Sequence, residues 1–128
     1  MKFERVFTNA PWENKVGYCR AIKAGNQIFV TGTAPVGEDG KTLEPGNPYA
    51  QAKKCIEIIE KSLQELGESL SCITRTRMFV TDISKWEEFG KAHAEFFGEN
   101  PPTTTMVEVK SLISEGMMIE IEADGVTG

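Results

Sequence analysis

The chain has 128 residues, of which 40% are hydrophobic and 26% charged, and this is the length and composition of one globular domain covering residues 1–128. No apolar run approaches the roughly 18 residues of a membrane span and the N-terminus lacks the apolar segment of a secretory signal, so no membrane association is expected. The net charge of −5 comes without a basic stripe, which counts against nucleic acid as a partner.

The first segments of the chain are predicted as β-strands. A short strand covers Phe3–Phe7, and two longer strands, Tyr18–Ala24 and Gln27–Gly32, flank the dipeptide Gly25-Asn26. Glycine and asparagine tolerate the backbone angles of a tight turn, so the second and third strands are expected to form a hairpin.

A helix is predicted after Asn47 and Pro48, because asparagine is a favoured capping residue and proline suits the first helical position. Gly67 is expected to end it. Apolar residues recur in between at every third or fourth position: Tyr49, Ala52, Ile56, Ile59, Leu63 and Leu66. This spacing places them on one continuous face, as in an amphipathic helix.

The second half of the chain alternates strand and helix. A strand is expected over Ile73–Thr81, and the next helix opens at Ser84 with a capping-box pattern and ends at Gly98. Two final strands are predicted over Thr103–Val109 and Met117–Ala123. The second helix carries an aromatic stripe that is expected to lie in the core: Trp86, Phe89, His93, Phe96 and Phe97.

The order β-β-β-α-β-α-β-β predicts an α+β fold, a mixed sheet with two helices packed on one face. Each helix is flanked by strands and can serve as a crossover between parallel neighbours, while the strands at the ends pair antiparallel. Two helices cannot cover both faces of such a sheet. The open face is therefore expected to be buried in an oligomer.

The usual motifs of phosphate binding, zinc proteases and serine hydrolases are absent. His93 is the single histidine, which excludes a multi-histidine metal site, and no metal or cofactor is expected. The cysteines at positions 19, 55 and 72 lack metal-ligand spacing, so free thiols in a reducing cytoplasm are expected. The sequence leaves open whether Cys19 and His93 face a cleft or the core.

The last strand places Glu120 and Glu122 on one face and Ile119 and Ile121 on the other, because side chains alternate along a strand. The glutamates are either solvated edge residues, or Glu120 is a general acid or base at a subunit boundary. In the second interpretation, partial burial raises the pKa of Glu120.

Four stretches carry a family resemblance: VGYCRAIKAGNQIFVTGTAP (16–35), RTRMFVTDISKWEEF (75–89), PTTTMVEVKSL (102–112) and IEIEADG (119–125). In order and spacing they resemble the Rid family of reactive intermediate deaminases, also called YjgF or liver perchloric-acid-soluble proteins. The NAPWE near the start and the HxxFFG at a helix end are similar to a divergent branch of that family.

The resemblance implies a chorismate-mutase-like fold assembled as a homotrimer, with a central β-barrel and a cleft between each pair of subunits. Active members of the family hydrolyse 2-aminoacrylate-type enamines and imines to 2-keto acids and ammonia without a cofactor. By resemblance, Tyr18 contacts the substrate, Glu120 positions water, and Thr31 and Gly32 match a serine-glycine strand end in the cleft.

The family pattern P-x-R-[ST]-x-V-E-V holds an arginine that grips the substrate carboxylate, and here Thr104, followed by Thr105, stands in its place. Gly90 replaces a common asparagine. An arginine binds a carboxylate through two charge-assisted hydrogen bonds that one neutral hydroxyl cannot reproduce. The exchange predicts roughly tenfold to a hundredfold weaker recognition of a carboxylate substrate.

Two functions are weighed on this basis. The first is an imine or enamine hydrolase that adds water to a small reactive C–N metabolite, with Glu120 and Tyr18 as catalytic residues. Its small-molecule contacts are Thr31, Gly32, Thr104 and Thr105. The second is a non-catalytic trimer that binds a small metabolite in the same cleft, as a sensor or partner protein. A ribonuclease, a name attached to parts of the family, is disfavoured by the acidic charge.

Overall fold

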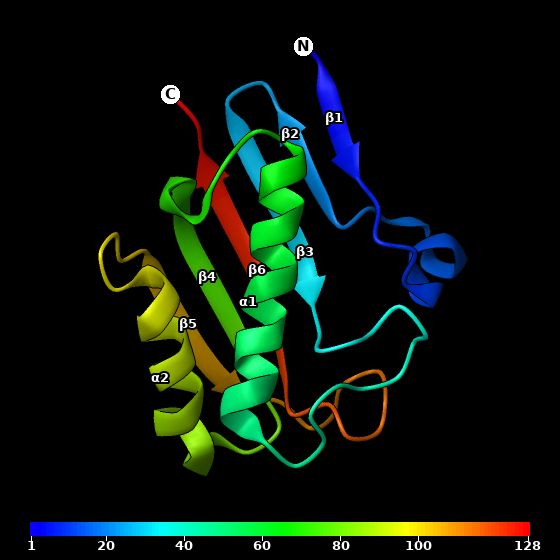
Figure 1. Ribbon diagram of the computed structural model, residues 1–128, viewed down its shortest axis with the longest axis vertical. Coiled ribbons are helices and arrows are strands. Elements are labelled where there is room, and N and C mark those ends of the chain that lie inside the picture. Colours follow the sequence, from blue (N-terminus) through cyan, green and yellow to red (C-terminus); the bar gives the residue numbers. More distant parts are fainter.

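One mixed sheet of six strands organises the chain, as a computed structural model describing residues 1–128 shows (Figure 1). In chain order the main elements are β1 (Phe3–Val6), β2 (Ala21–Ala24), β3 (Gln27–Thr33), α1 (Pro48–Glu65), β4 (Ile73–Val80), α2 (Trp86–Phe97), β5 (Thr103–Glu108) and β6 (Ile119–Val126). The predicted α+β class and the order of elements are confirmed. Across the sheet the strands follow the order β1-β2-β3-β6-β4-β5.

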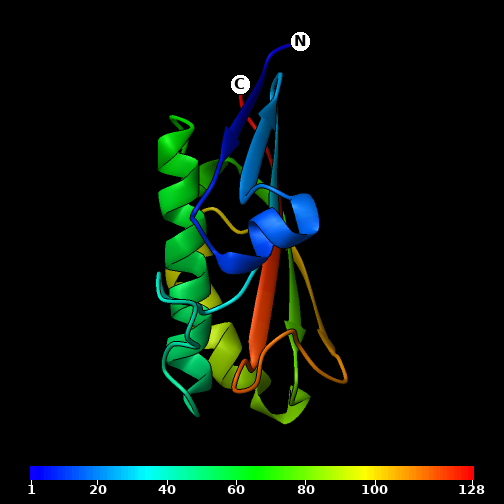
Figure 2. The same ribbon diagram turned by 90° about the vertical axis from the view of Figure 1, so that its right-hand side faces the viewer.

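Both helices pack on the same face of the sheet, as predicted, and Figure 2 shows the other face without a covering layer. The helix α2 joins β4 to its parallel neighbour β5, which is the expected crossover. The helix α1 leads from β3 to β4, but β6 lies between these two strands and pairs antiparallel with both. The expectation of neighbouring strands is therefore wrong for this crossover. No helix combines the length and the apolar character needed to cross a membrane.

The core lies between the helices and the sheet. It is formed by apolar side chains that recur at every third or fourth residue of the helices and at every second residue of the strands. In β6 the side chains of Ile119 and Ile121 are fully buried while Glu120 and Glu122 point to the other face, as predicted. The predicted apolar face of α1 is buried from Ala52 to Leu66. Its start is also as expected, because Asn47 Oδ1 accepts a hydrogen bond of 3.0 Å from the Ala50 backbone N–H.

The start of α2 differs from the prediction. Ser84 does not cap the helix, because its backbone N–H and its hydroxyl both donate to Asp82 Oδ1 within a short helical turn at Ile83–Lys85. The helix follows directly from this turn without a side-chain cap. Trp86, expected in the core, is 56% exposed, and the buried face of α2 begins with Phe89.

The strand β2 begins at Ala21 and not at Tyr18 as predicted. Upstream of it, residues Glu13–Gly17 form a single wide helical turn. The carboxylate of Glu13 explains the departure from strand geometry, because it binds Arg20 Nη2 at 3.2 Å and Nε at 3.3 Å and also accepts hydrogen bonds from Thr8. The segment must loop outward so that these side chains meet.

This ion pair is almost completely removed from solvent, with 6% of the Arg20 side chain and 3% of the Glu13 side chain exposed. The second amino group of Arg20 donates to the backbone carbonyl of Gly32 at 2.8 Å and to the hydroxyl of Thr33 at 3.3 Å. Four hydrogen bonds thus use most of the five donors of the guanidinium. The pair connects the N-terminal segment to the end of β3.

Removing one partner of the ion pair should be strongly destabilising, because a buried charge is left without compensation. We expect Glu13→Ala to lower the free energy of unfolding by about 3 kcal/mol or more. Replacing both partners, in Glu13→Leu with Arg20→Met, should restore a large part of that loss. Urea denaturation followed by circular dichroism measures both.

The partly exposed pair of Lys23 and Glu68, with Nζ and Oε2 2.8 Å apart, provides the control. Glu68→Ala should lower the free energy of unfolding far less than Glu13→Ala does, because an exposed ion pair contributes little to stability. Equal losses for Glu13→Ala and Glu68→Ala would contradict the special role of the buried pair.

Candidate functional site

The end of β3 is shaped by a glycine that lies directly against a carboxylate. The pairing of β3 with β6 shifts register between Val30 and Thr33, so the sheet is irregular at Gly32. A Cβ added to Gly32 would lie 2.6 Å from Glu120 Oε2 and 2.9 Å from its Cδ. A side chain at position 32 would therefore push the carboxylate away, and glycine lets Glu120 fold over the backbone of β3.

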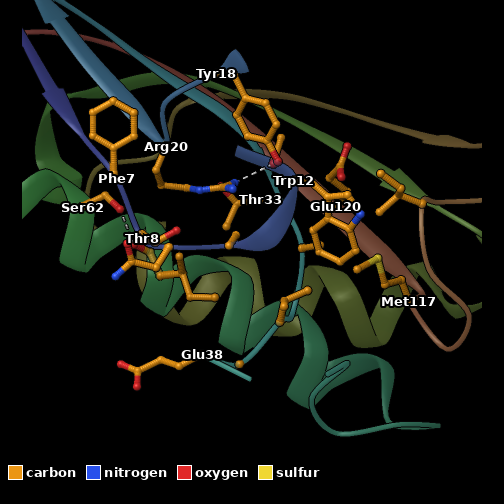
Figure 3. A pocket seen from close by; sticks show the side chains of 18 of the residues that line it. Phe7, Thr8, Trp12, Tyr18, Arg20, Thr33, Glu38, Ser62, Met117 and Glu120 are labelled. Atoms are coloured by element: carbon orange, nitrogen blue, oxygen red, sulfur yellow. Dashed lines mark hydrogen bonds between the residues drawn. The ribbon is translucent and has the colours of Figure 1, made fainter. Parts of the chain in front are cut away.

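Glu120 and Gly32 belong to the wall of a cavity of about 780 Å³. Figure 3 shows Tyr18, Trp12 and Arg20 extending into the same space, with residues of α1 forming the opposite wall. The cavity is lined from four parts of the chain: the segment before β2, the end of β3 with its following loop, one face of α1, and the segment that leads into β6.

Burial raises the pKa of Glu120 above its ordinary value, and the negative charge of Glu122 acts in the same direction. The positive charge of Arg20 opposes this shift. A raised pKa is what the sequence analysis expected if Glu120 is a general acid or base at a subunit boundary. A carboxyl group with a raised pKa exchanges protons closer to neutral pH than an ordinary glutamate does, which suits a general acid or base.

Arg20 is a wall residue that sequence reasoning missed. Its guanidinium lies 5.5 Å from the centre of the Tyr18 ring and its bonds to Glu13 and Gly32 hold three parts of the wall together. No periodic pattern marks Glu13 and Arg20 as partners. Their spacing of seven residues becomes a contact only because the chain forms a wide turn between them.

The structure brings together three of the predicted site residues, namely Tyr18, Gly32 and Glu120. Thr31 does not line this wall but lies on the open face of the sheet. There it lines a smaller cavity together with Tyr18 and Cys19. Cys19 is half-buried and its thiol is free. Tyr18 is thus shared by both cavities.

Thr104 and Thr105 lie on β5, at the far edge of the sheet, and line neither of these cavities. The hydroxyl of Thr104 is 2.7 Å from that of Thr76, which in turn lies 2.8 Å from Nε2 of His93. Within one chain, Thr104 therefore belongs to a hydrogen-bonded row beneath α2 and is separated from Glu120 by β4.

His93 lies in the core and faces neither cavity. Burial lowers the pKa of the ring, so the neutral form is favoured. Its ring packs on Phe97 with 4.5 Å between ring centres. Of the two open questions from the sequence, His93 thus faces the core, while Cys19 faces a cavity on the open side of the sheet.

Residues 7–127 match the Ribonuc_L-PSP family, which is described as Endoribonuclease L-PSP. A RutC family protein from Pyrococcus abyssi is 32% identical over 96% of this chain and 96% of its own length. The 3-aminoacrylate deaminase RutC from Acinetobacter baylyi is 31% identical over 81% of this chain and 82% of its own length.

Among solved structures, the chain is similar to Rv2704 from Mycobacterium tuberculosis, described as a member of the YjgF/YER057c/UK114 family. The TM-score is 0.88 and the identity 39%, over 98% of this chain and 100% of the other. Sequence and fold agree along almost the whole length, and the chain therefore belongs to the Ribonuc_L-PSP family, the group of YjgF, RutC and Rid proteins.

Proposed function

We propose that this protein hydrolyses a small imine or enamine by adding water to the carbon of the C–N bond, without a cofactor. The observation that carries the proposal is the half-buried carboxylate of Glu120, held against Gly32 in the wall of a cavity that also contains Tyr18. The 3-aminoacrylate deaminase among the relatives supports the reaction class.

In the proposed reaction an enamine is first protonated on carbon and becomes an iminium ion, while an imine reaches the same state by protonation on nitrogen. Glu120 takes a proton from water as the water oxygen bonds to the iminium carbon, giving a carbinolamine. Glu120 returns this proton to the nitrogen. The carbon–nitrogen bond then breaks and the departing ammonia takes up the hydroxyl proton, leaving a carbonyl compound and ammonium.

Tyr18 packs against the substrate or donates a hydrogen bond to it in this scheme. The position of Thr104 argues against classical activity on 2-aminoacrylate, because a neutral hydroxyl that already bonds Thr76 cannot replace a bidentate arginine. Thr31, Thr104 and Thr105 contact substrate in this proposal only if the cleft is completed by a neighbouring copy of the chain.

A homotrimer with a central β-barrel fits these requirements. The face of the sheet opposite the helices exposes apolar side chains, with Phe29 45% and Val107 43% exposed. Burial of this face against other copies would remove them from water. Because β5 is an edge strand, an adjacent copy in such an assembly can bring Thr104 and Thr105 to the cavity of its neighbour. The free thiols fit a cytoplasmic protein.

The second candidate function is binding of a small metabolite without catalysis, as a sensor or partner protein. The absence of the arginine at position 104 favours it, since the family's most specific catalytic signal is missing. Cleavage of RNA is disfavoured because the net charge of −5 repels a polyanion.

The catalytic role of Glu120 predicts that Glu120→Gln lowers the rate of imine hydrolysis by about a hundredfold or more. Gly32→Ala should also lower it, because the added methyl group displaces the carboxylate. The assay follows ammonia released from imines that an amine oxidase or an amino-acid oxidase forms in situ. Glu60→Gln on α1, outside the cavity, removes the same charge and should leave the rate unchanged.

A wild-type rate no higher than spontaneous hydrolysis, for carboxylated and carboxylate-free imines alike, would exclude the enzymatic function. It would leave the binding function as the better account of the site.

The exchange at position 104 predicts weak activity on freshly generated 2-aminoacrylate and a measurable gain in Thr104→Arg, because the arginine restores capture of the carboxylate. The gain should be partial, since Gly90 marks a second change from the family pattern. Gln64→Arg adds the same charge at an exposed position of α1 outside both cavities and should give no gain. High activity of the unmodified protein would show that the carboxylate is bound elsewhere.

The uncovered sheet face predicts a trimer in solution. Sedimentation equilibrium at micromolar concentration should give three times the chain mass of 14.2 kDa. Val107→Glu places a charge on the exposed face and should shift the equilibrium toward monomer. A monomer mass for the unmodified protein at this concentration would be incompatible with a cleft between subunits.

A further inference from the structure

The main cavity is larger than the simplest substrates of the proposed reaction need. Its volume of about 780 Å³ falls within the range of pockets that bury most of a drug-sized ligand. A molecule of a few heavy atoms would leave most of this space to water. The size therefore favours a substrate that carries a sizeable group besides its C–N bond.

One part of the walls suits an apolar group. Ten of the 22 lining residues are hydrophobic, and aromatic rings of Phe7, Trp12 and Tyr18 are among them. Phe7 is 57% and Ile113 61% exposed, so apolar surface remains in contact with water at the mouth of the cavity. A ligand with an aromatic or similarly sized apolar body would cover these side chains.

The charges of the cavity disfavour an anion. Its charged lining residues comprise two basic and three acidic ones: Arg20, Lys61, Glu38, Glu65 and Glu120. The buried cation, Arg20, is already neutralised by Glu13, and Lys61 lies exposed on α1. A substrate carboxylate would lose its water shell beside Glu120 without gaining a free buried cation.

The same arrangement suits a cation. The carboxylate of Glu120 is half-buried and its charge is only partly opposed by the paired Arg20. The face of Trp12 attracts positively charged groups, whereas the Tyr18 ring already has the Arg20 guanidinium 5.5 Å from its centre. A protonated imine would thus meet a negative charge and the aromatic face of Trp12 within one cavity.

We propose that the cavity binds a carboxylate-free cation with an aromatic or similarly sized apolar body, and that the substrate is the iminium ion of an aldehyde or ketone of this kind. The second part rests on the hydrolase function proposed above. The reaction is then the addition of one water molecule to the iminium carbon and the loss of ammonium, which leaves the aldehyde or ketone.

The binding part is tested with two stable compounds of nearly equal size and opposite charge, phenethylamine and phenylacetate. Calorimetric titration of the full-length protein should show binding of phenethylamine, which is protonated at pH 7, at least about tenfold tighter than that of phenylacetate. Glu120→Gln should lower the affinity for phenethylamine by about tenfold, which is the typical effect of losing one hydrogen bond to a charged group. Glu60→Gln serves as the control for net charge.

Trp12→Ala tests whether the aromatic wall contributes to binding. It should lower the affinity for phenethylamine several-fold while leaving the circular dichroism spectrum unchanged. Equal or tighter binding of phenylacetate, absence of binding by phenethylamine, or insensitivity to both Glu120→Gln and Trp12→Ala would each overturn the proposal.

The substrate part is tested with two imines formed in situ. An amine oxidase converts phenethylamine to the imine of phenylacetaldehyde, and an amino-acid oxidase converts phenylalanine to the imine that retains the carboxylate. Ammonia release should be accelerated more for the first. Faster turnover of the carboxylated imine would overturn this inference while the hydrolase function stands. Binding of phenethylamine with neither imine accelerated would instead overturn the hydrolase function and leave the ligand class supported.

Discussion

The buried ion pair of Glu13 and Arg20 is the interaction on which the candidate site depends. It joins the segment before β2 to the end of β3, because Arg20 binds the carbonyl of Gly32 and Glu13 binds Thr8. Two charges this far from water are stable only when each compensates the other and the remaining donors are satisfied. The pair therefore restricts the N-terminal segment to one position, and that position forms one wall of the cavity.

The same pair determines the electrostatics around Glu120. Arg20 is close enough to oppose the rise in the pKa of Glu120, yet its charge is already compensated by Glu13. Gly32 adds the steric condition, since only a residue without a side chain lets the carboxylate lie against β3. The result is a half-buried carboxylate in a cavity that offers no free buried cation, and this combination distinguishes a site for cations or neutral molecules from a site for carboxylates.

At the edge of the sheet, the role of Thr104 follows from its neighbours. Thr104 turns its hydroxyl toward Thr76, which is also hydrogen-bonded to His93. An arginine is too long to end there and would extend beyond the edge strand. The chain thus uses this exposed position for a hydrogen bond to the buried Thr76 within its own sheet, and this is the physical basis for proposing a ligand other than a carboxylate.

The sequence by itself determined the α+β class, the order of the eight main elements, the buried face of α1, its cap at Asn47 and the common face of Glu120 and Glu122. These features follow from periodicities and capping preferences that act within a few residues. Family motifs also indicated one group of site residues, of which the structure places Tyr18, Gly32 and Glu120 in one cavity and Thr31, Thr104 and Thr105 outside it.

Only the tertiary structure decided the insertion of β6 between β3 and β4, the meeting of Glu13 with Arg20, and the row from His93 through Thr76 to Thr104. Each depends on contacts between segments without a shared local pattern, where the free energy comes from burial and from satisfying polar groups. The predicted cap of α2 at Ser84 is absent for a local reason, because the hydroxyl of Ser84 donates to Asp82 instead. Local sequence patterns limit which residues can become partners, and the packing of distant segments decides which of these pairs form.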